Sequence, residues 1–224
     1  MLARCGAGRT GWDSVLDVAE HDLTRRIRDA ILSGEFAAGR RLVEADLTAR
    51  FDASRAAVRL ALIDLAHEGL VERLPNRGAR VRSISVEEAI EIVEARAGLE
   101  ALCARKAAEH LGEEEADELV ELRTALVAAV DDGDIVRYSR LIQELDERLR
   151  EYSAHVTATR LLERLQAQSA RHQFRLAFAP GRAQASLAQH LAIIDAVLAG
   201  DPEGAERATR EHLEDVAGLL RRVE

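Results

Sequence analysis

The spacing of apolar residues predicts a largely helical chain with one short interruption. Val58, Leu62 and Leu65 share one face of a helix that begins near residue 54. Two short runs then follow, at 70–74 and 79–82, and each has the length and composition of a strand. The order of short helix, turn, helix and hairpin predicts a winged helix-turn-helix in the first part of the chain.

Beyond residue 84 no segment alternates as a strand does, and helical patterns continue to the C-terminus. Gly, Asp and Pro residues separate these helical patterns from one another. Asp201-Pro202 offers an N-cap followed by a proline at the first helical position. The fold class is therefore predicted as mostly α, with an all-α antiparallel bundle of about six helices after the winged helix. The predicted helices span about 85–110, 113–130, 134–153, 159–178, 182–199 and 202–224.

The helix that follows residue 54 carries a second, basic face. Ser54 is placed as its N-cap, and Arg55 and Arg59, four residues apart, lie together away from the apolar face. Arginine on such a helix can contact guanine or phosphate in the major groove. Arg77 and Gly78 lie at the tip of the predicted hairpin, where they would reach an adjacent groove. Together these features predict a DNA-binding domain.

The net charge of the chain also changes at residue 84, where the predicted winged helix ends. Residues 1–84 carry a net charge of +2 and residues 85–224 one of −11, within a total of −9. A basic N-terminal part and an acidic C-terminal part suit a DNA-binding domain joined to a domain that does not bind DNA. The expected organisation is a loose lead over 1–15, a winged helix-turn-helix over 16–84 and a bundle over 85–224.

Several classes of protein are disfavoured. Cys5 and Cys103 are far apart and lack metal-ligand spacing, which favours reduced thiols in a cytoplasmic protein. No apolar run reaches the roughly 18 residues of a membrane span, so no membrane association is expected. The chain has no nucleophile elbow, no Walker loop and no His-Glu-x-x-His motif, because His67-Glu68 lacks the second histidine. We therefore do not expect an enzyme.

The first part of the chain resembles the GntR family of bacterial transcription regulators, over residues 21–84. Two departures are visible: Ala56-Ala57 stands where the family usually has Thr-Pro, and Leu60 stands where it usually has Glu. The matching motifs are Ala30-Ile31-Leu32-Ser33-Gly34, Gly39-Arg40-Arg41-Leu42, Glu44-Ala45-Asp46-Leu47, Ser54-Arg55-Ala56-Ala57-Val58-Arg59 and Arg77-Gly78.

The resemblance implies double-stranded operator DNA as a partner. Loss of the threonine hydroxyl at position 56 removes one expected DNA contact, whereas the two arginines remain, so binding is expected to persist with an altered contact set. The expected DNA-binding residues are Arg40, Glu44, Ser54, Arg55, Ala56, Arg59, Arg77 and Gly78.

Residues 86–222 resemble the FCD domain, the ligand-sensing bundle of the FadR subgroup. The resemblance implies one divalent metal (zinc, nickel or manganese) held by Asp146, His190 and His212. Arg150 occupies the position of the family's fourth ligand and cannot bind a cation. The matching motifs are Arg96-Ala97-Gly98-Leu99-Glu100, Leu145-Asp146, Leu149-Arg150, Gln189-His190-Leu191-Ala192-Ile193-Ile194-Asp195-Ala196, Gly200-Asp201 and Arg210-Glu211-His212-Leu213.

Three readings of this site stay open. Water or an effector carboxylate completes a three-ligand metal site. Alternatively Arg150 replaces the metal, either holding an anionic effector or pairing with Asp146 one helical turn away. In the third reading His190 and His212 are core residues of apolar helix faces and bind nothing.

The leading functional prediction is a homodimeric regulator whose operator binding responds to a small effector. The resemblance implies dimerisation through the bundle and an organic or sugar acid as effector, with Arg96, Arg150, Arg171 and Arg175 as candidate contacts. One alternative is a metal-dependent enzyme in the bundle, with the winged helix as a docking module. A second is an architectural DNA binder without an effector, which an apolar bundle interior would support and a polar pocket would oppose.

Overall fold

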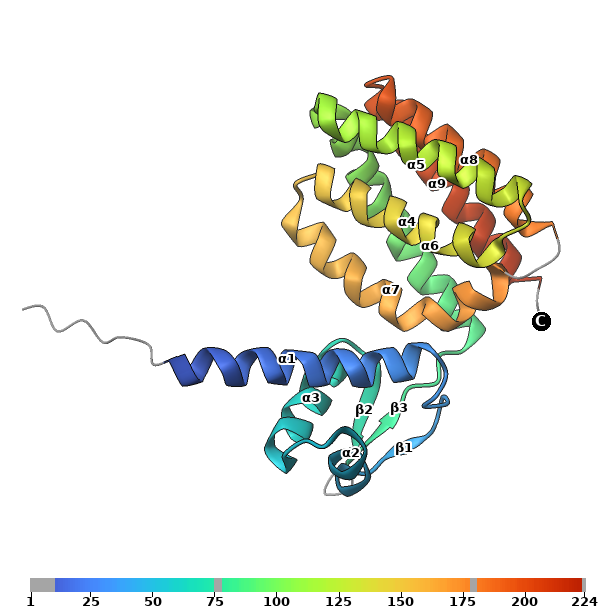
Figure 1. The fold of residues 1–224 in the computed structure, drawn as a ribbon. Coiled ribbons are helices and arrows are strands. Elements are labelled where there is room, and N and C mark those ends of the chain that lie inside the picture. Colours follow the sequence, from blue (N-terminus) through green and yellow to red (C-terminus); the bar gives the residue numbers. More distant parts are fainter. Residues whose placement is uncertain (1–10, 75–77, 178–180, 223–224) are drawn as a thin grey trace, which may run out of the picture. The chain divides into compact units, whose positions relative to one another are not determined.

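The computed structural model describes residues 11–74, 78–177 and 181–222, with only the backbone described at 11–21 and 170–177. Packing divides the chain into two units, residues 1–83 and 84–224 (Figure 1). No helix in these described ranges is long and apolar enough to cross a membrane. Each unit has its own core, and each is described by itself.

The first unit is a winged helix-turn-helix, as predicted. Its helices pack around a core that includes Ile27, Leu47, Val58 and Leu65. The elements are α1 (Gly11–Leu32), β1 (Arg41–Leu42), α2 (Glu44–Phe51), α3 (Arg55–His67), β2 (Val71–Leu74) and β3 (Gly78–Val81). Since α1 begins at Gly11, the expected loose lead over 1–15 is wrong for residues 11–15, which are helical.

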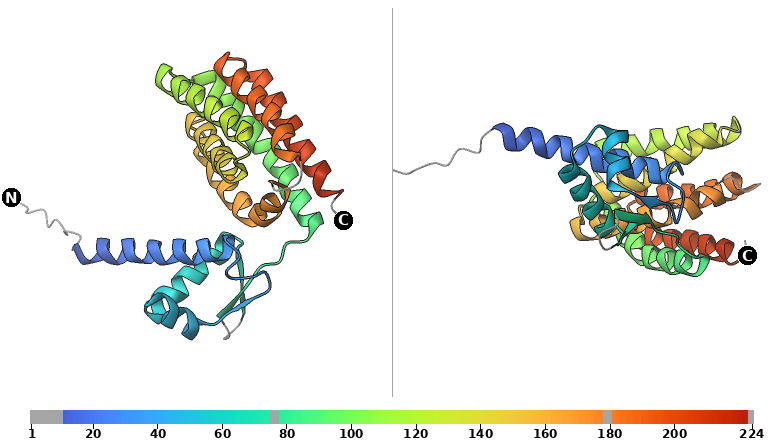
Figure 2. Two further views of the ribbon diagram at one scale, coloured as in Figure 1. Left: turned by 45° about the vertical axis from the view of Figure 1, so that its right-hand side comes forward. Right: turned by 90° about the horizontal axis from the view of Figure 1, so that it is seen from below.

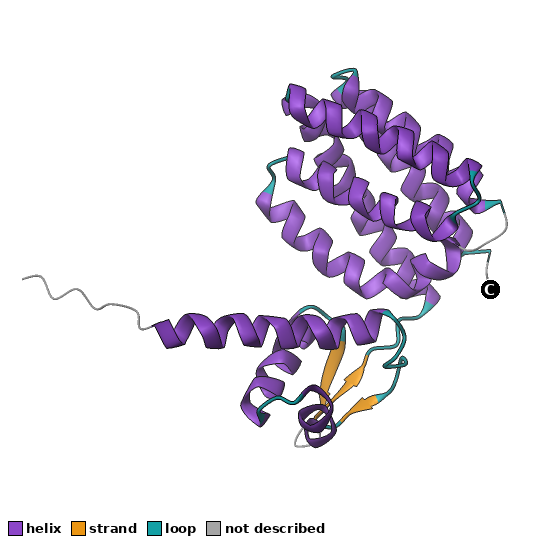
Figure 3. Ribbon diagram, in the orientation of Figure 1, coloured by secondary structure: helices purple, strands orange, loops and turns teal. Residues whose placement is uncertain are grey.

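The wing is a three-stranded antiparallel sheet rather than a two-stranded hairpin. Its strand order is β1-β3-β2, and β1 pairs with β3 through Arg41 opposite Arg80 and Leu42 opposite Ala79 (Figure 3). The sequence pattern predicted only a turn at this position, because two residues are too few to show an alternation. The extra strand fixes the segment before α2 to the sheet.

The second unit contains the six helices that the sequence predicted. Its central core includes Leu119, Leu126, Leu145, Ile194 and Val197. In both views of Figure 2, α4 (green) and α9 (red) lie side by side, and this pair makes the most extensive contact of the unit. The helices are α4 (Val86–His110), α5 (Glu113–Asp131), α6 (Ile135–Tyr152), α7 (Val156–Ala177), α8 (Arg182–Leu198) and α9 (Pro202–Leu220).

Local signals account for the helix ends. The Ser54 hydroxyl accepts from the Ala57 N–H, and the Asp201 carboxylate accepts from the Gly204 N–H, which confirms both predicted N-caps. Gly69 follows α3 at φ +76°, a conformation that disfavours residues with a Cβ. These signals explain why the predicted and observed boundaries agree closely.

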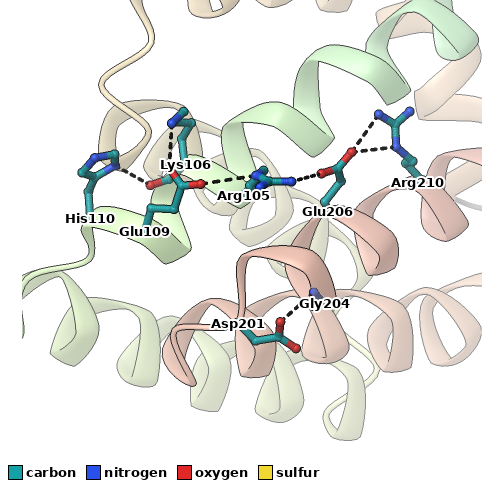
Figure 4. Close-up of polar contacts among 8 residues, drawn as sticks. All are labelled: Arg105, Lys106, Glu109, His110, Asp201, Gly204, Glu206 and Arg210. Carbon is teal, nitrogen blue, oxygen red and sulfur yellow. Dashed lines mark hydrogen bonds and ion pairs between the residues drawn. The ribbon is translucent and has the colours of Figure 1, made fainter.

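An ion pair between Arg105 and Glu206 crosses the α4–α9 contact, and Arg210 extends this ladder of charged side chains along α9 (Figure 4). Arg105 Nη1 lies 3.0 Å from Glu206 Oε2, and Arg210 Nη2 lies 3.0 Å from Glu206 Oε1. Hydrogen bonds from these two arginines hold the pKa of Glu206 below its ordinary value. Because the ladder is solvent-exposed, it adds little stability, and apolar packing of residues such as Val93 and Leu213 holds the two helices together.

Candidate functional site

Helix α3 presents two arginines on its exposed face. Val58 and Leu65 are fully buried on the opposite face, and this fixes how the helix is turned. Arg55 and Arg59, which open the first and second turns, are therefore exposed, as the sequence predicted. Ala56 is exposed beside them.

These arginines border an open groove between α2, α3 and the wing. Two further basic residues, Arg41 on β1 and Arg73 on β2, line the same groove and were not predicted. The signal available for them was an arginine in the segment just before α2 and another in the first strand of the predicted hairpin. The groove is lined by Arg41, Val43, Glu44, Ala45, Arg55, Arg59, Arg73, Leu74 and Gly78. Its basic lining suits a polyanion.

One acidic residue stands among these arginines. Arg59 Nε donates to Glu44 Oε2 at 2.8 Å, so α2 holds the side chain of Arg59 in one orientation. Arg55 has no ion-pair partner among the residues that the structure describes. Within the described part of the chain, α3 thus presents one guanidinium oriented by a carboxylate and one without an ion-pair partner.

Two other predicted DNA-binding residues, Arg40 and Gly78, make close contacts within the chain itself. Arg40 donates to the Glu35 carbonyl and stacks on the Phe36 ring, 5.0 Å from its centroid, and it does not line the groove. Gly78 has φ +82°, and a Cβ there would lie 2.3 Å from the Leu42 carbonyl oxygen. Its close approach is therefore to β1 of the same chain. Arg77 lies outside the described residues.

The second unit contains a small cavity, of about 20 Å³, whose lining includes charged and polar side chains. It brings together the four positions that the sequence singled out: Asp146 and Arg150 from α6, His190 from α8 and His212 from α9. This volume is close to that of one water molecule. The complete lining is Glu100, Cys103, Leu145, Asp146, Leu149, Arg150, His190, Ile193, Thr209 and His212.

Gln166 of α7 bridges the two charged residues of α6. Arg150 Nη1 donates to Gln166 Oε1 at 2.9 Å, and Gln166 Nε2 donates to Asp146 Oδ2 at 3.1 Å. Burial and the nearby Glu100 raise the pKa of Asp146 well above its ordinary value. The predicted Arg150–Asp146 interaction is therefore mediated by an amide that the sequence analysis did not identify.

Both histidines are held through Nδ1. His190 Nδ1 lies 2.7 Å from the Ser186 carbonyl, and His212 Nδ1 lies 2.9 Å from Gln189 Oε1. Burial lowers the pKa of His190 to about 4 and that of His212 well below its ordinary value. Both rings are therefore neutral near pH 7. With Nδ1–H as the donor, each Nε2 carries a lone pair.

Arg96 is a further predicted effector contact. It is buried but does not line the cavity, and its Nη2 pairs with Glu100 Oε1 at 2.7 Å. Glu100, the last residue of the matching motif that begins at Arg96, does line the cavity. The side chains of Arg171 and Arg175 lie outside the described residues.

The residues present do not fit a divalent metal. No group of three or more His, Cys, Asp or Glu side chains within the described ranges is arranged to hold one. Arg150, which is always protonated, lines the same cavity as the predicted ligands, and Asp146 already accepts from Gln166. Asp146, His190 and His212 line one cavity, as expected, and their role as ligands of a metal stays a prediction.

Comparison with known families agrees with both units. The family described as bacterial regulatory proteins, gntR family, matches residues 20–81. The FCD domain matches residues 91–215, which is more than half of the chain. FCD domains often bind a metal.

Individual relatives span most of the chain. The HTH-type transcriptional repressor RspR of Escherichia coli K12 is 27% identical over 199 residues, covering 89% of this chain and 87% of RspR. An HTH-type transcriptional regulator from an unstable DNA locus of Streptomyces ambofaciens is 30% identical over 213 residues, covering 90% and 85%.

Solved structures share the fold. Escherichia coli McbR/YncC superimposes with a TM-score of 0.76 at 20% identity, covering 91% of this chain and 97% of that one. Together, the matches to both family models and the full-length relatives agree with the winged helix and the six-helix bundle. The chain belongs to the GntR family of bacterial transcription regulators and carries a C-terminal FCD domain.

Proposed function

We propose that this protein is a repressor that binds its operator as a homodimer and releases it when a small acid binds the bundle. The observation that carries the proposal is the α3 face with exposed Arg55 and Arg59 at the edge of a basic groove. RspR, a relative over most of its length, is described as a repressor. Two half-sites of an operator require two copies of α3, which supports a homodimer.

In this proposal each groove residue has a distinct role. Arg55 is exposed and unpaired within the described part of the chain, so it contacts a base or phosphate directly. Arg59 is oriented by Glu44, which restricts the positions that its guanidinium can reach. Arg41 and Arg73 contact the backbone phosphates from the wing.

Selection from a random duplex library with the purified full-length protein would yield the operator. Fluorescence anisotropy on that operator then compares wild type with Arg55→Ala and with Arg25→Ala, an exposed arginine of α1 outside the groove. We expect Arg55→Ala to weaken specific binding at least about fivefold, since a good bidentate contact is worth about 1–3 kcal/mol. Equal affinity of Arg55→Ala and wild type would refute the docking model.

The proposed effector is a small hydroxy acid. Arg150 can donate two parallel hydrogen bonds to a carboxylate, and the Nε2 atoms of His190 and His212 can accept from hydroxyl groups. The cavity as it stands holds about one water, so an effector must displace Gln166 from Arg150. The polar lining also counts against the architectural alternative, in which the bundle has no ligand.

Thermal-shift measurements can test this assignment. A panel of hydroxy acids is compared with neutral polyols of equal size, which lack the carboxylate that Arg150 would bind. We expect one or more acids, and none of the polyols, to raise the melting temperature and to release the selected operator. Stabilisation by polyols and acids alike would mean that Arg150 does not select the ligand.

A further inference from the structure

The polar cavity of the second unit contains a fixed cation that belongs to the chain itself. Arg150 lies on α6 one helical turn after Asp146, so the two side chains project to the same side of the helix. The residue is only 8% exposed, and its guanidinium lines the same cavity as His190 and His212.

The charged groups around this cavity already have partners within the protein. Arg96 pairs with the Glu100 carboxylate at 2.7 Å, and Arg150 is linked to Asp146 through Gln166. Two guanidinium groups and two carboxyl groups thus make contacts that involve no ion. A divalent ion would add two positive charges beside Arg150 in a buried site, where such repulsion is poorly screened.

The donor geometry agrees with the charge argument. The Asp146 carboxylate accepts from Gln166, and none of the described cavity residues forms a group of three metal-ligating side chains. The two histidines keep their Nδ1 atoms on Ser186 and Gln189, which orients the rings without any ion. The cavity is therefore built and held by protein groups alone.

We infer that Arg150 replaces the metal ion in this protein, so that the cavity binds no divalent cation and an anionic ligand is held directly by the guanidinium. The inference extends the proposed effector site, but its test detects metal rather than DNA or effector. If the protein proved not to have the proposed function, the metal measurement could therefore still be interpreted.

The test asks whether a single substitution at position 150 creates a metal-binding site. Wild-type protein, Arg150→His and Arg150→Gln are purified alike, dialysed against zinc, nickel or manganese, and analysed for bound metal by elemental analysis. Arg150→His supplies the missing imidazole beside Asp146, His190 and His212, so we expect about one tightly bound ion per chain. Wild type and Arg150→Gln, which adds no nitrogen ligand, should remain at background.

Two further measurements establish where the ion binds and whether each variant is folded. The double variant Arg150→His with Asp146→Asn should lose the gained ion, which places that ion in the cavity. Circular dichroism melts with and without metal establish that each variant is folded, and the ion should raise the melting temperature of Arg150→His alone. Stoichiometric metal in wild type, or a folded Arg150→His variant without metal, would overturn the inference.

Discussion

Gln166 on α7 and Arg150 on α6 are joined by a 2.9 Å hydrogen bond, in which the guanidinium donates to the amide oxygen. The same amide donates to Asp146, so one neutral side chain satisfies both charged groups of the cavity. In the proposed effector site, a carboxylate that binds Arg150 through Nη1 would take the position that the Gln166 oxygen occupies. Gln166 would therefore compete with such an acid for Arg150.

Removal of this competitor should strengthen ligand binding. Gln166→Ala leaves Arg150 without its acceptor and enlarges the cavity, so the acid that stabilises wild type should bind more tightly. We expect a gain of about threefold to tenfold, the value of one hydrogen bond of roughly 1 kcal/mol. Isothermal titration calorimetry measures it, with Gln143→Ala, an exposed glutamine of α6, as the control. Weaker binding by Gln166→Ala would show that the amide is part of the ligand site.

The Arg59–Glu44 pair should affect how DNA binding depends on salt. Arg59→Ala removes a cationic contact, so the slope of log K against log salt should become shallower by about 1 if Arg59 neutralises a phosphate. Glu44→Gln keeps the cation and removes a nearby negative charge, so binding to random DNA should tighten. Anisotropy titrations at several salt concentrations measure both, and an unchanged slope in Arg59→Ala would exclude the phosphate contact.

Gly78 should be required for the stability of the wing. Gly78→Ala places a Cβ 2.3 Å from the Leu42 carbonyl oxygen and retains a φ of +82°. We expect a loss of about 1–3 kcal/mol in the free energy of unfolding of the first unit. Gly34→Ala is the matched control, because Gly34 has a similar φ of +84° but no atom within 4 Å of the added Cβ. Equal losses in the two variants, by urea denaturation, would mean that the contact with β1 costs nothing.

Cys103 should be unreactive in the folded protein. Burial raises the pKa of its thiol, so the neutral form is favoured in the folded state. The corresponding stability is present below the pKa of the unfolded thiol, about 8.5, and is lost as the pH rises through the higher folded value. In a Cys5→Ser background, a disulfide reagent should modify Cys103 slowly at pH 8 and rapidly in guanidinium chloride. Rapid modification without denaturant would contradict this expectation.

The sequence predicted most of the fold because its local signals are strong. Ser54, Gly69 and Asp201 mark helix ends through their own hydrogen bonds or backbone conformations, and these depend on few distant contacts. β1 was missed because its two residues become a strand only through pairing with β3. That pairing joins positions almost forty residues apart and leaves no periodic pattern in the sequence.

The candidate sites were predicted in part. The basic face of α3 follows from helical spacing, and the cavity residues Asp146, Arg150, His190 and His212 were brought together as the resemblance implied. Gln166 could not be predicted, because a glutamine on a helix gives no indication of its partners. Arg41 and Arg73 were missed because their place in the groove depends on how the strands pack beside α3.

Helix α9 connects the cavity of the second unit to the start of the bundle. It runs unbroken from Pro202 to Leu220, so His212 in the cavity and Leu220 are separated by roughly 12 Å of continuous helix. Leu220 belongs to the apolar cluster that packs against Ile84, the first residue after the winged-helix unit. We therefore expect that a rotation of α9 at His212 would alter the packing around Ile84, at the start of the bundle.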